Sequence, residues 1–209
     1  MTVLNAQVSR LPDLDIAALS AGQQRVYEAI RSGPRGVVQG PLRVWLQSAD
    51  LADKAQALGA FCRYGTSLPA RLSELAILVM AAHWQAGFEW AAHAPIALKA
   101  GLEPAAVEAI RNGSTPVFAD AEARVIHAFA SELLRNRRVS DATYAEALAL
   151  FGTRTVVELV GILGYYTLIS MTIAVFDVAL AEGAADPFAG RDDHGHSARQ
   201  EGQVWSPSV

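Results

Sequence analysis

Apolar residues recur at intervals of three and four along most of the chain, and no segment alternates apolar and polar residues over a sustained run. Such intervals place apolar side chains on one face of an α-helix, whereas a half-buried strand alternates with a period of two. The pattern therefore predicts an all-α protein. We expect helices at 20–32, 42–47, from 48 or 50 to 65, and at 70–84, 88–99, 104–112, 119–135, 140–151 and 156–181.

Capping residues and helix breakers support these boundaries. Ser20 and Ser140 stand where an N-cap side chain would accept a hydrogen bond from the first helical turn. The segment 33–41, GPRGVVQGP, stops the first helix and is expected to be a loop that lines a pocket. Pro95 lies inside a predicted helix and should kink it just beyond His93, because proline removes one amide hydrogen bond.

The helical pattern is confined to one part of the chain. We expect a single helical domain at 20–182, an N-terminal extension at 1–19, and a polar tail at 183–209 that is disordered or wraps a neighbouring subunit. Two stretches, 70–94 and 153–176, each contain an arginine, then a glutamate, then a long apolar run. This likeness predicts a duplicated helical hairpin.

Composition limits the partners and the cellular compartment. With 52% hydrophobic and 18% charged residues, the chain has little charge to cover its surface, which favours a homo-oligomer. A net charge of -4 and the absence of any Lys/Arg run argue against nucleic acid. No secretion signal is evident, and the apolar stretch 159–176 contains Gly, Tyr, Ser and Thr, so we interpret it as a buried helix and expect a cytoplasmic protein without a membrane span.

Candidate chemistry gathers in the apolar segment 71–101, which contains Glu74, His83, Glu89 and His93. Glu89 and His93 are four residues apart, so they project from one helix face and can share a proton. Imidazole titrates near neutral pH, which makes His93 the first candidate. Glu74 lies in the run LSELAILVMAA, where it must face solvent or find a buried partner, and His93 is a candidate partner.

Each of these residues also has a structural interpretation. Glu89 and His93 can be a surface pair worth only a few tenths of a kcal/mol, and His83 can point at the pocket or bind the last carbonyls of its helix. The four side chains are metal-capable types, but their spacing matches no H-E-x-x-H or cysteine-rich pattern, and Cys62 is the only cysteine. We therefore expect no metal and no disulfide.

A carboxylate-binding pocket is expected next to these groups. Arginine holds carboxylates by paired hydrogen bonds, and aromatic rings often form pocket walls. The candidates for binding the substrate are Arg43, Arg63, Arg71, Tyr64, Trp90 and His83, with Trp45 and Phe88 as further aromatic candidates for the wall. We assign no role to His127, His194 or His196.

Two segments carry a resemblance to a known family. They are FCRYGTSLPARLSELAILVMAAHWQAGFEWAAHAPIALKAGL at 61–102 and VSDATYAEALALFGTRTVVELVGILGYY at 139–166. Over roughly 20–180 the chain resembles the carboxymuconolactone decarboxylase family, which also contains the alkyl hydroperoxidase D proteins. The resemblance implies the alkyl hydroperoxidase D-like helical fold with a pseudo-repeated hairpin, in an oligomer that is a dimer, trimer or hexamer.

The resemblance also indicates to which branch of the family the chain is similar, the dithiol hydroperoxidases or the members without the cysteine pair. In the hydroperoxidases a Glu precedes a CxxC pair by twelve residues and a His follows the second Cys by four, and Glu74 and His93 keep this register. The two cysteine positions hold Ala86 and Glu89, so peroxide reduction through a dithiol is excluded. The chain is similar to the cysteine-free branch, to which lactone decarboxylases belong.

We therefore expect a lyase without cofactors that decarboxylates a small carboxylated lactone or related ring acid. In this hypothesis His93 protonates the carbanion that loss of CO₂ leaves behind, Glu89 orients or recharges the imidazole, and Glu74 supports the pair or relays a proton. An arginine holds the remaining carboxylate. Two alternatives stay open, an isomerase, dehydratase or cyclisation enzyme on the same scaffold and a non-catalytic helical oligomer that binds a small acid.

Overall fold

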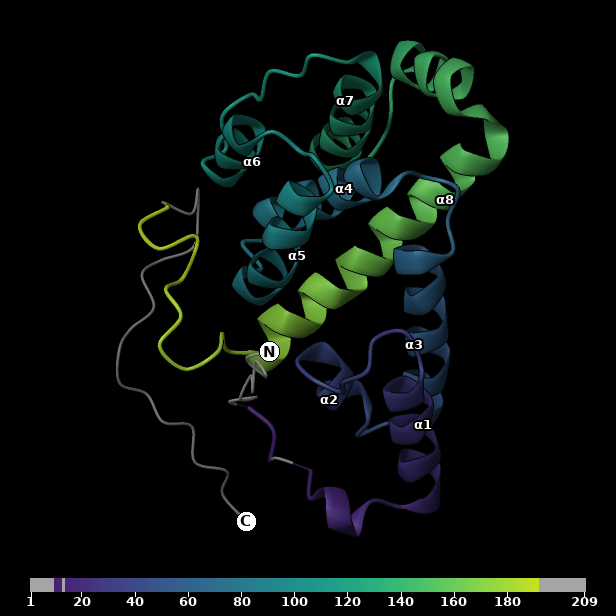
Figure 1. Cartoon of the computed structure of the whole chain (residues 1–209), viewed down its shortest axis with the longest axis vertical. Coiled ribbons are helices and arrows are strands. Elements are labelled where there is room, and N and C mark those ends of the chain that lie inside the picture. Colours follow the sequence, from purple (N-terminus) through teal and green to yellow (C-terminus); the bar gives the residue numbers. More distant parts are fainter. Residues whose placement is uncertain (1–9, 13, 192–209) are drawn as a thin grey trace.

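The computed structural model describes residues 10–12 and 14–191, and the regular elements in these ranges are helices, which confirms the expected all-α fold (Figure 1). A short 3₁₀ turn at Ile16–Ala18 comes first. The α-helices are α1 (Ala21–Ser32), α2 (Pro41–Trp45), α3 (Ala49–Tyr64), α4 (Ala70–His83), α5 (Gly87–Lys99), α6 (Pro104–Arg111), α7 (Ala121–Asn136) and α8 (Asp141–Phe176).

The helix ends follow the capping residues. Ser20 and Gln23 form a reciprocal capping box at the start of α1, and the side chain of Ser140 accepts a hydrogen bond from the backbone of Thr143. Both expected N-caps are confirmed. α5 continues through Pro95 to Lys99.

The two helices expected in the C-terminal region are present and meet at a kink. One element, α8, covers both, and Gly152 with φ 74° and ψ 167° interrupts its helical geometry at the bend visible in Figure 1. α8 ends at Phe176, before the expected end at 181, because Asp177 adopts a left-handed conformation with φ 50°. The apolar pattern beyond Phe176 was therefore wrongly assigned to helix.

α4 forms the centre of one group of helices. Leu75, Ile77 and Leu78 are completely buried, and α4 contacts α5, α6, α7 and α8. Burying each of these side chains stabilises the fold by about 1.5–3 kcal/mol relative to leaving it exposed. Because α4 is surrounded in this way, Glu74 in its second turn has no access to bulk water.

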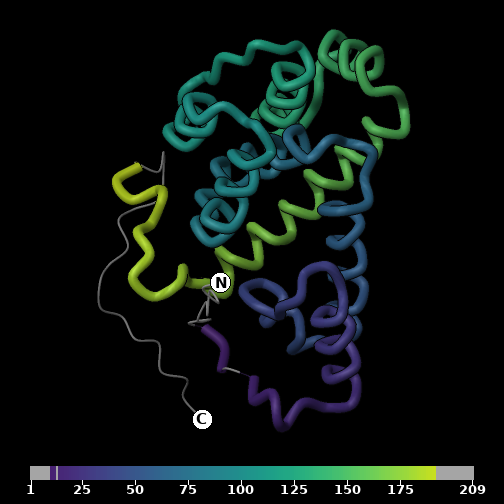
Figure 2. The backbone as a smooth tube through the Cα atoms, in the orientation of Figure 1, coloured from purple at the N-terminus to yellow at the C-terminus, as the bar shows by residue number. Residues whose placement is uncertain are grey.

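α8 separates this group from a second one. α1, α2 and α3 contact one another and lie on one side of α8, while α4 to α7 lie on its other side (Figures 1 and 2). Segments that are far apart in the sequence meet where the two groups approach each other along α8. The functional residues described below come from this junction.

The first residues of the expected tail lie against this chain's own helices. The ring of Phe188 meets Trp90 of α5 edge to face at 5.4 Å, and Arg191 donates hydrogen bonds to the carbonyls of Ala82 and Arg111. His194 and His196 lie outside the described residues, as does most of the tail.

Within the described part of the chain, α8 is the one helix long and apolar enough to cross a membrane by length and composition. This is weak evidence, since half of the apolar window is buried inside the protein, as in a core helix. Part of its apolar surface nevertheless remains uncovered. Six exposed or half-buried residues, spaced alternately four and three apart, form a stripe along α8: Val157, Gly161, Gly164, Leu168, Met171 and Val175.

We expect Gly40→Ala to destabilise the protein more than Gly36→Ala, although both glycines have positive φ values, 55° and 70°. Left-handed backbone costs an alanine roughly 1–2 kcal/mol at either position. A Cβ at Gly40 would also overlap the ring of Phe88, whereas a Cβ at Gly36 meets nothing within 4 Å. Overpacking should add about 1–3 kcal/mol to the loss, measurable by urea denaturation. Equal losses would show that Phe88 moves aside freely.

Candidate active site

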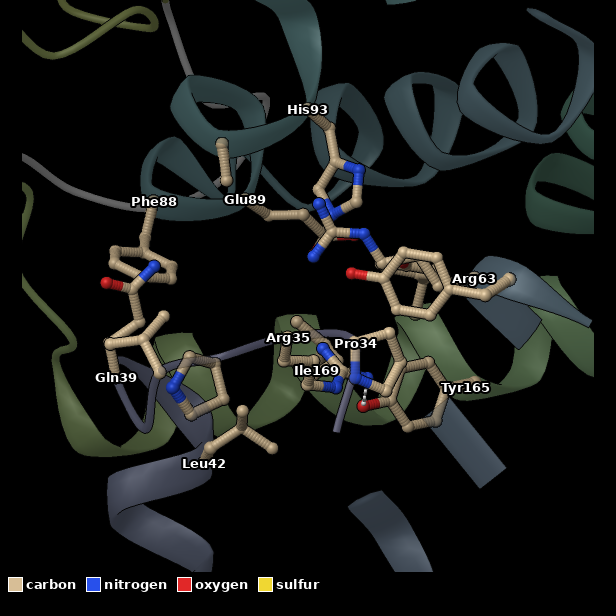
Figure 3. A pocket seen from close by; sticks show the side chains of 15 residues that line it. Pro34, Arg35, Gln39, Leu42, Arg63, Phe88, Glu89, His93, Tyr165 and Ile169 are labelled. Atoms are coloured by element: carbon tan, nitrogen blue, oxygen red, sulfur yellow. Dashed lines mark hydrogen bonds between the residues drawn. The ribbon is translucent and has the colours of Figure 1, made fainter. Parts of the chain in front are cut away.

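A cavity of about 340 Å³ lies between the two helix groups (Figure 3). Its walls come from the loop before α2, the end of α3, one face of α5 and the middle of α8. The lining residues are Pro34, Arg35, Val37, Gln39, Pro41, Leu42, Arg63, Tyr64, Phe88, Glu89, Ala92, His93, Tyr165, Tyr166 and Ile169. The loop at 33–41 thus lines a pocket, as its glycines and prolines suggested.

A buried hydrogen bond joins His93 of α5 to Glu74 of α4. The distance between His93 Nδ1 and Glu74 Oε2 is 2.7 Å, and the two residues are only 6% and 4% exposed. When Glu74 is a carboxylate it accepts this bond, so Nδ1 carries the proton and Nε2 keeps a free lone pair. Burial lowers the pKa of His93 more than Glu74 raises it, and Arg63 and Arg35 lower it further. The imidazole is therefore neutral near pH 7.

Glu89 lies one helical turn before His93 and has a different environment. It is 2% exposed, its Oε2 accepts a 3.0 Å hydrogen bond from Ser170 of α8, and its Oε1 has no hydrogen-bond partner. Burial raises the pKa of Glu89 well above the usual 4.5, and the charge of Glu74 adds to this effect, while the bond from Ser170 opposes it. Burial thus favours the uncharged, protonated form of Glu89, which lines the cavity.

The expected contact between Glu89 and His93 is wrong. Both side chains project from the same face of α5 into the cavity, but Glu74 holds the imidazole and Ser170 holds Glu89. The ring of Tyr166 supports His93 by an edge-to-face contact at 5.1 Å. The helix spacing permitted a Glu89–His93 bond, and the neighbouring helices supplied better-placed partners.

The three expected arginines occupy three different places. Arg63 lines the cavity, whereas Arg43 lines a separate cavity of about 230 Å³ beside α1. Arg71 forms a two-pronged ion pair with Asp120, at 2.9 and 3.1 Å, and Asp120 also caps α7. Arg43 and Arg71 therefore do not face the cavity that contains Glu89.

Of the aromatic residues and the histidine that were expected to line the substrate cavity, only some do so. Tyr64 and Phe88 line the cavity, but Trp90 packs on Phe188, and Trp45 donates a 3.0 Å hydrogen bond to Thr172 inside the core. His83 stands exposed at the end of α4, outside the cavity. A ring in an apolar segment has several buried surfaces available, and its sequence position does not distinguish among them.

Cys62 lies buried on α3 and does not line the cavity, and burial raises the pKa of its thiol. Among the described residues, no three His, Cys, Asp or Glu side chains come together as ligands for a metal ion.

Part of the chain is similar to a known family. Residues 49–132 match the profile of the carboxymuconolactone decarboxylase family. The resemblance inferred from the sequence is confirmed over this segment, which runs from α3 into α7 and contains Glu74, Glu89 and His93.

The structure of an uncharacterized peroxidase-related protein from Silicibacter sp. TM1040 is similar to this one. Its TM-score is 0.68 at 16% sequence identity, and the alignment covers 85% of this chain and 94% of that chain. At this identity the similarity establishes a shared fold. No curated protein matches the chain.

Several residues of the site lie outside the segment that matches the carboxymuconolactone decarboxylase family. Arg35 comes from the loop before α2, and Tyr165 and Tyr166 of α8 also line the cavity. Ser170 of α8 does not line the cavity but donates the hydrogen bond to Glu89. The sequence had marked the loop but not its arginine, and the two tyrosines and the serine are ordinary in an apolar core helix. Only their approach to α5 and to each other makes them part of the site.

We expect Glu89→Gln to change how stability depends on pH. Folded wild-type protein keeps the proton on Glu89 because its pKa is raised, whereas the unfolded chain releases it above about 4.5. As pH rises above that value, the unfolded state binds fewer protons than the folded state, so the wild-type free energy of unfolding falls. Glutamine stays neutral, so Glu89→Gln should lose less stability between about pH 5 and pH 8, as measured by urea unfolding.

The matched control is Glu122→Gln, which alters an exposed carboxylate on α7. Its pH profile should run parallel to that of wild type. A parallel profile for Glu89→Gln as well would mean that Glu89 is ionised in the folded protein.

Proposed function

We propose that this protein is a cofactor-independent lyase that decarboxylates a small carboxylated lactone or a related ring acid. The observation that carries the proposal is the cavity that Glu89, His93 and Arg63 line together, in which burial raises the pKa of the carboxyl group and lowers the pKa of the imidazole. Proton donors and acceptors of this kind are suited to general acid–base catalysis near neutral pH. Membership of the matched segment in the carboxymuconolactone decarboxylase family supports this reaction class.

The reaction needs one proton. The bond between the ring carbon and its carboxylate breaks, CO₂ leaves, and the electron pair stays on the ring and delocalises into the unsaturated lactone. Glu89 then gives its proton to the carbon, so that a new C–H bond forms. Arg63 in the cavity wall would attract the developing negative charge.

His93 suits the role of a base more than that of the acid. Desolvation moves the two pKa values in opposite directions, upward for Glu89 and downward for His93. After the transfer, ionised Glu89 would be buried near Glu74, which favours its recovery of a proton. In this proposal a water molecule that enters the cavity gives a proton to Nε2 of His93 while Glu74 holds Nδ1, and His93 then passes that proton to Glu89, one helical turn away.

A proton-transferring isomerase is the second candidate function. The presence of both an acid and a base on one cavity favours it, because such a pair can move a proton between two ring carbons without breaking a C–C bond. A dehydratase or cyclisation enzyme would use the same two groups. The similar structure is that of a peroxidase-related protein. We do not propose a dithiol peroxidase reaction for this chain, because Ala86 and Glu89 occupy the two cysteine positions.

The proposal predicts deuterium incorporation with CO₂ release. A panel of carboxylated unsaturated lactones is incubated with the protein in D₂O, and CO₂ and the position of deuterium are measured. A decarboxylase should incorporate one deuteron for each CO₂. Glu89→Gln should lower the rate by about 10²–10⁴-fold, because glutamine keeps the shape of the acid but cannot donate that proton to carbon.

Glu122→Gln is again the control and should react like wild type. Deuterium exchange without CO₂ would favour the isomerase, and binding without either would favour a non-catalytic protein that binds small acids. An undiminished rate in Glu89→Gln would contradict the assignment of Glu89 as proton donor.

We also propose that the protein is a homo-oligomer assembled through the exposed stripe of α8. Its residues are spaced alternately three and four apart, as along the contact line between two packed helices, and its two glycines would allow a helix of another subunit to approach closely.

Met171→Glu should shift the protein to a smaller species in sedimentation velocity, whereas Thr153→Glu, an exposed change outside the stripe, should not. A wild-type monomer would contradict this proposal.

A further inference from the structure

Two buried atoms in the cavity residues lack hydrogen-bond partners. In the described part of the chain, the buried side-chain nitrogen and oxygen atoms without a partner are Arg35 Nε and Glu89 Oε1. Leaving such a group unpaired costs about 1–3 kcal/mol, so folded proteins contain few of them. Arg35 and Glu89 both line the same cavity. A ligand in this cavity would provide partners for both.

The two groups face each other across the open space. Figure 3 shows Glu89 and His93 on one side of the cavity and Arg35 with Tyr165 on the opposite side. Arg35 Nη2 donates a 3.2 Å hydrogen bond to the hydroxyl of Tyr165, whose ring packs edge to face against Trp45 at 6.0 Å. The guanidinium is therefore held in place by a buried residue of α8, although Arg35 itself belongs to a loop.

The charge of the cavity selects an anion. Arg35 and Arg63 both line it, and neither forms an ion pair with a carboxylate among the described residues. Glu89 is the one acidic residue in the described lining, and burial raises its pKa, which favours its uncharged form. Guanidinium groups remain charged at all relevant pH values. The two arginines thus make the lining favourable for a bound anion.

We propose that Arg35 is a positioning residue that anchors a carboxylate of the substrate and thereby holds the ring with its reacting carbon next to Glu89. This inference rests on the proposed function and adds the residue that selects the substrate. Arg35 is better suited to this than Arg63, whose guanidinium lies over the ring of exposed Tyr64 at 5.2 Å at the end of α3. A hydrogen bond from Tyr165 pre-orients Arg35, which lowers the entropy lost on binding.

Equilibrium binding of two matched probes tests this assignment. Benzoate and benzamide share a ring and differ in charge, and calorimetry gives the affinity of each. Wild type should prefer benzoate, and Arg35→Gln should weaken benzoate binding by about 10- to 100-fold while benzamide binding stays the same. Arg35→Lys should retain part of the preference, and Tyr165→Phe should reduce it to a smaller degree. Arg25→Gln, an exposed change on α1, should leave it intact.

Three results would overturn the inference. They are a wild-type protein that does not prefer benzoate, an Arg35→Gln variant that keeps the preference, and loss of the preference in Arg63→Gln alone. If Arg35→Gln does not fold, Arg35→Lys and Tyr165→Phe carry the same test. Binding requires no turnover, so these results are independent of the deuterium experiment, which tests the proposed reaction itself.

Discussion

The buried hydrogen bond between Glu74 and His93 is the interaction on which the candidate site depends. α4 is surrounded by other helices, so a carboxylate in its second turn would be strongly destabilising without a partner. His93 supplies the partner, and with Glu74 as a carboxylate the bond fixes the tautomer of the imidazole. The bond joins α4 to the face of α5 from which Glu89 and His93 line the cavity.

The same lack of water divides the roles of the two titratable groups in the cavity. Desolvation disfavours charge, so it raises the pKa of an acid and lowers the pKa of a base. These opposite shifts suit Glu89 to the proposed role of proton donor and His93 to that of proton acceptor. Ser170 moderates the effect on Glu89 by one hydrogen bond, and leaves its second oxygen available to a ligand.

The position of Glu89 also separates this chain from the dithiol proteins that it resembles. In the resemblance to the hydroperoxidases, Glu74 and His93 keep the register and Glu89 stands at the second cysteine position. A scaffold that holds a glutamate–histidine pair next to position 89 can support thiol chemistry or proton transfer, depending on the side chain there. The rest of the cavity comes from α8 and the loop before α2, outside the segment that matches the carboxymuconolactone decarboxylase family.

The helices could be predicted from the sequence, because apolar periodicity and caps are local properties, and Glu74, Glu89 and His93 stood out as polar residues in an apolar segment. Their hydrogen-bond partners depend on how the helices pack. Glu89 and His93 are neighbours on one helix, yet Ser170 and Glu74 approach from other helices and take those hydrogen bonds. No sequence pattern marked Arg35, Tyr165 or Ser170 as part of the site. Their importance depends on which faces of the loop and the helices meet along α8, and contacts between distant segments leave no local pattern in the sequence.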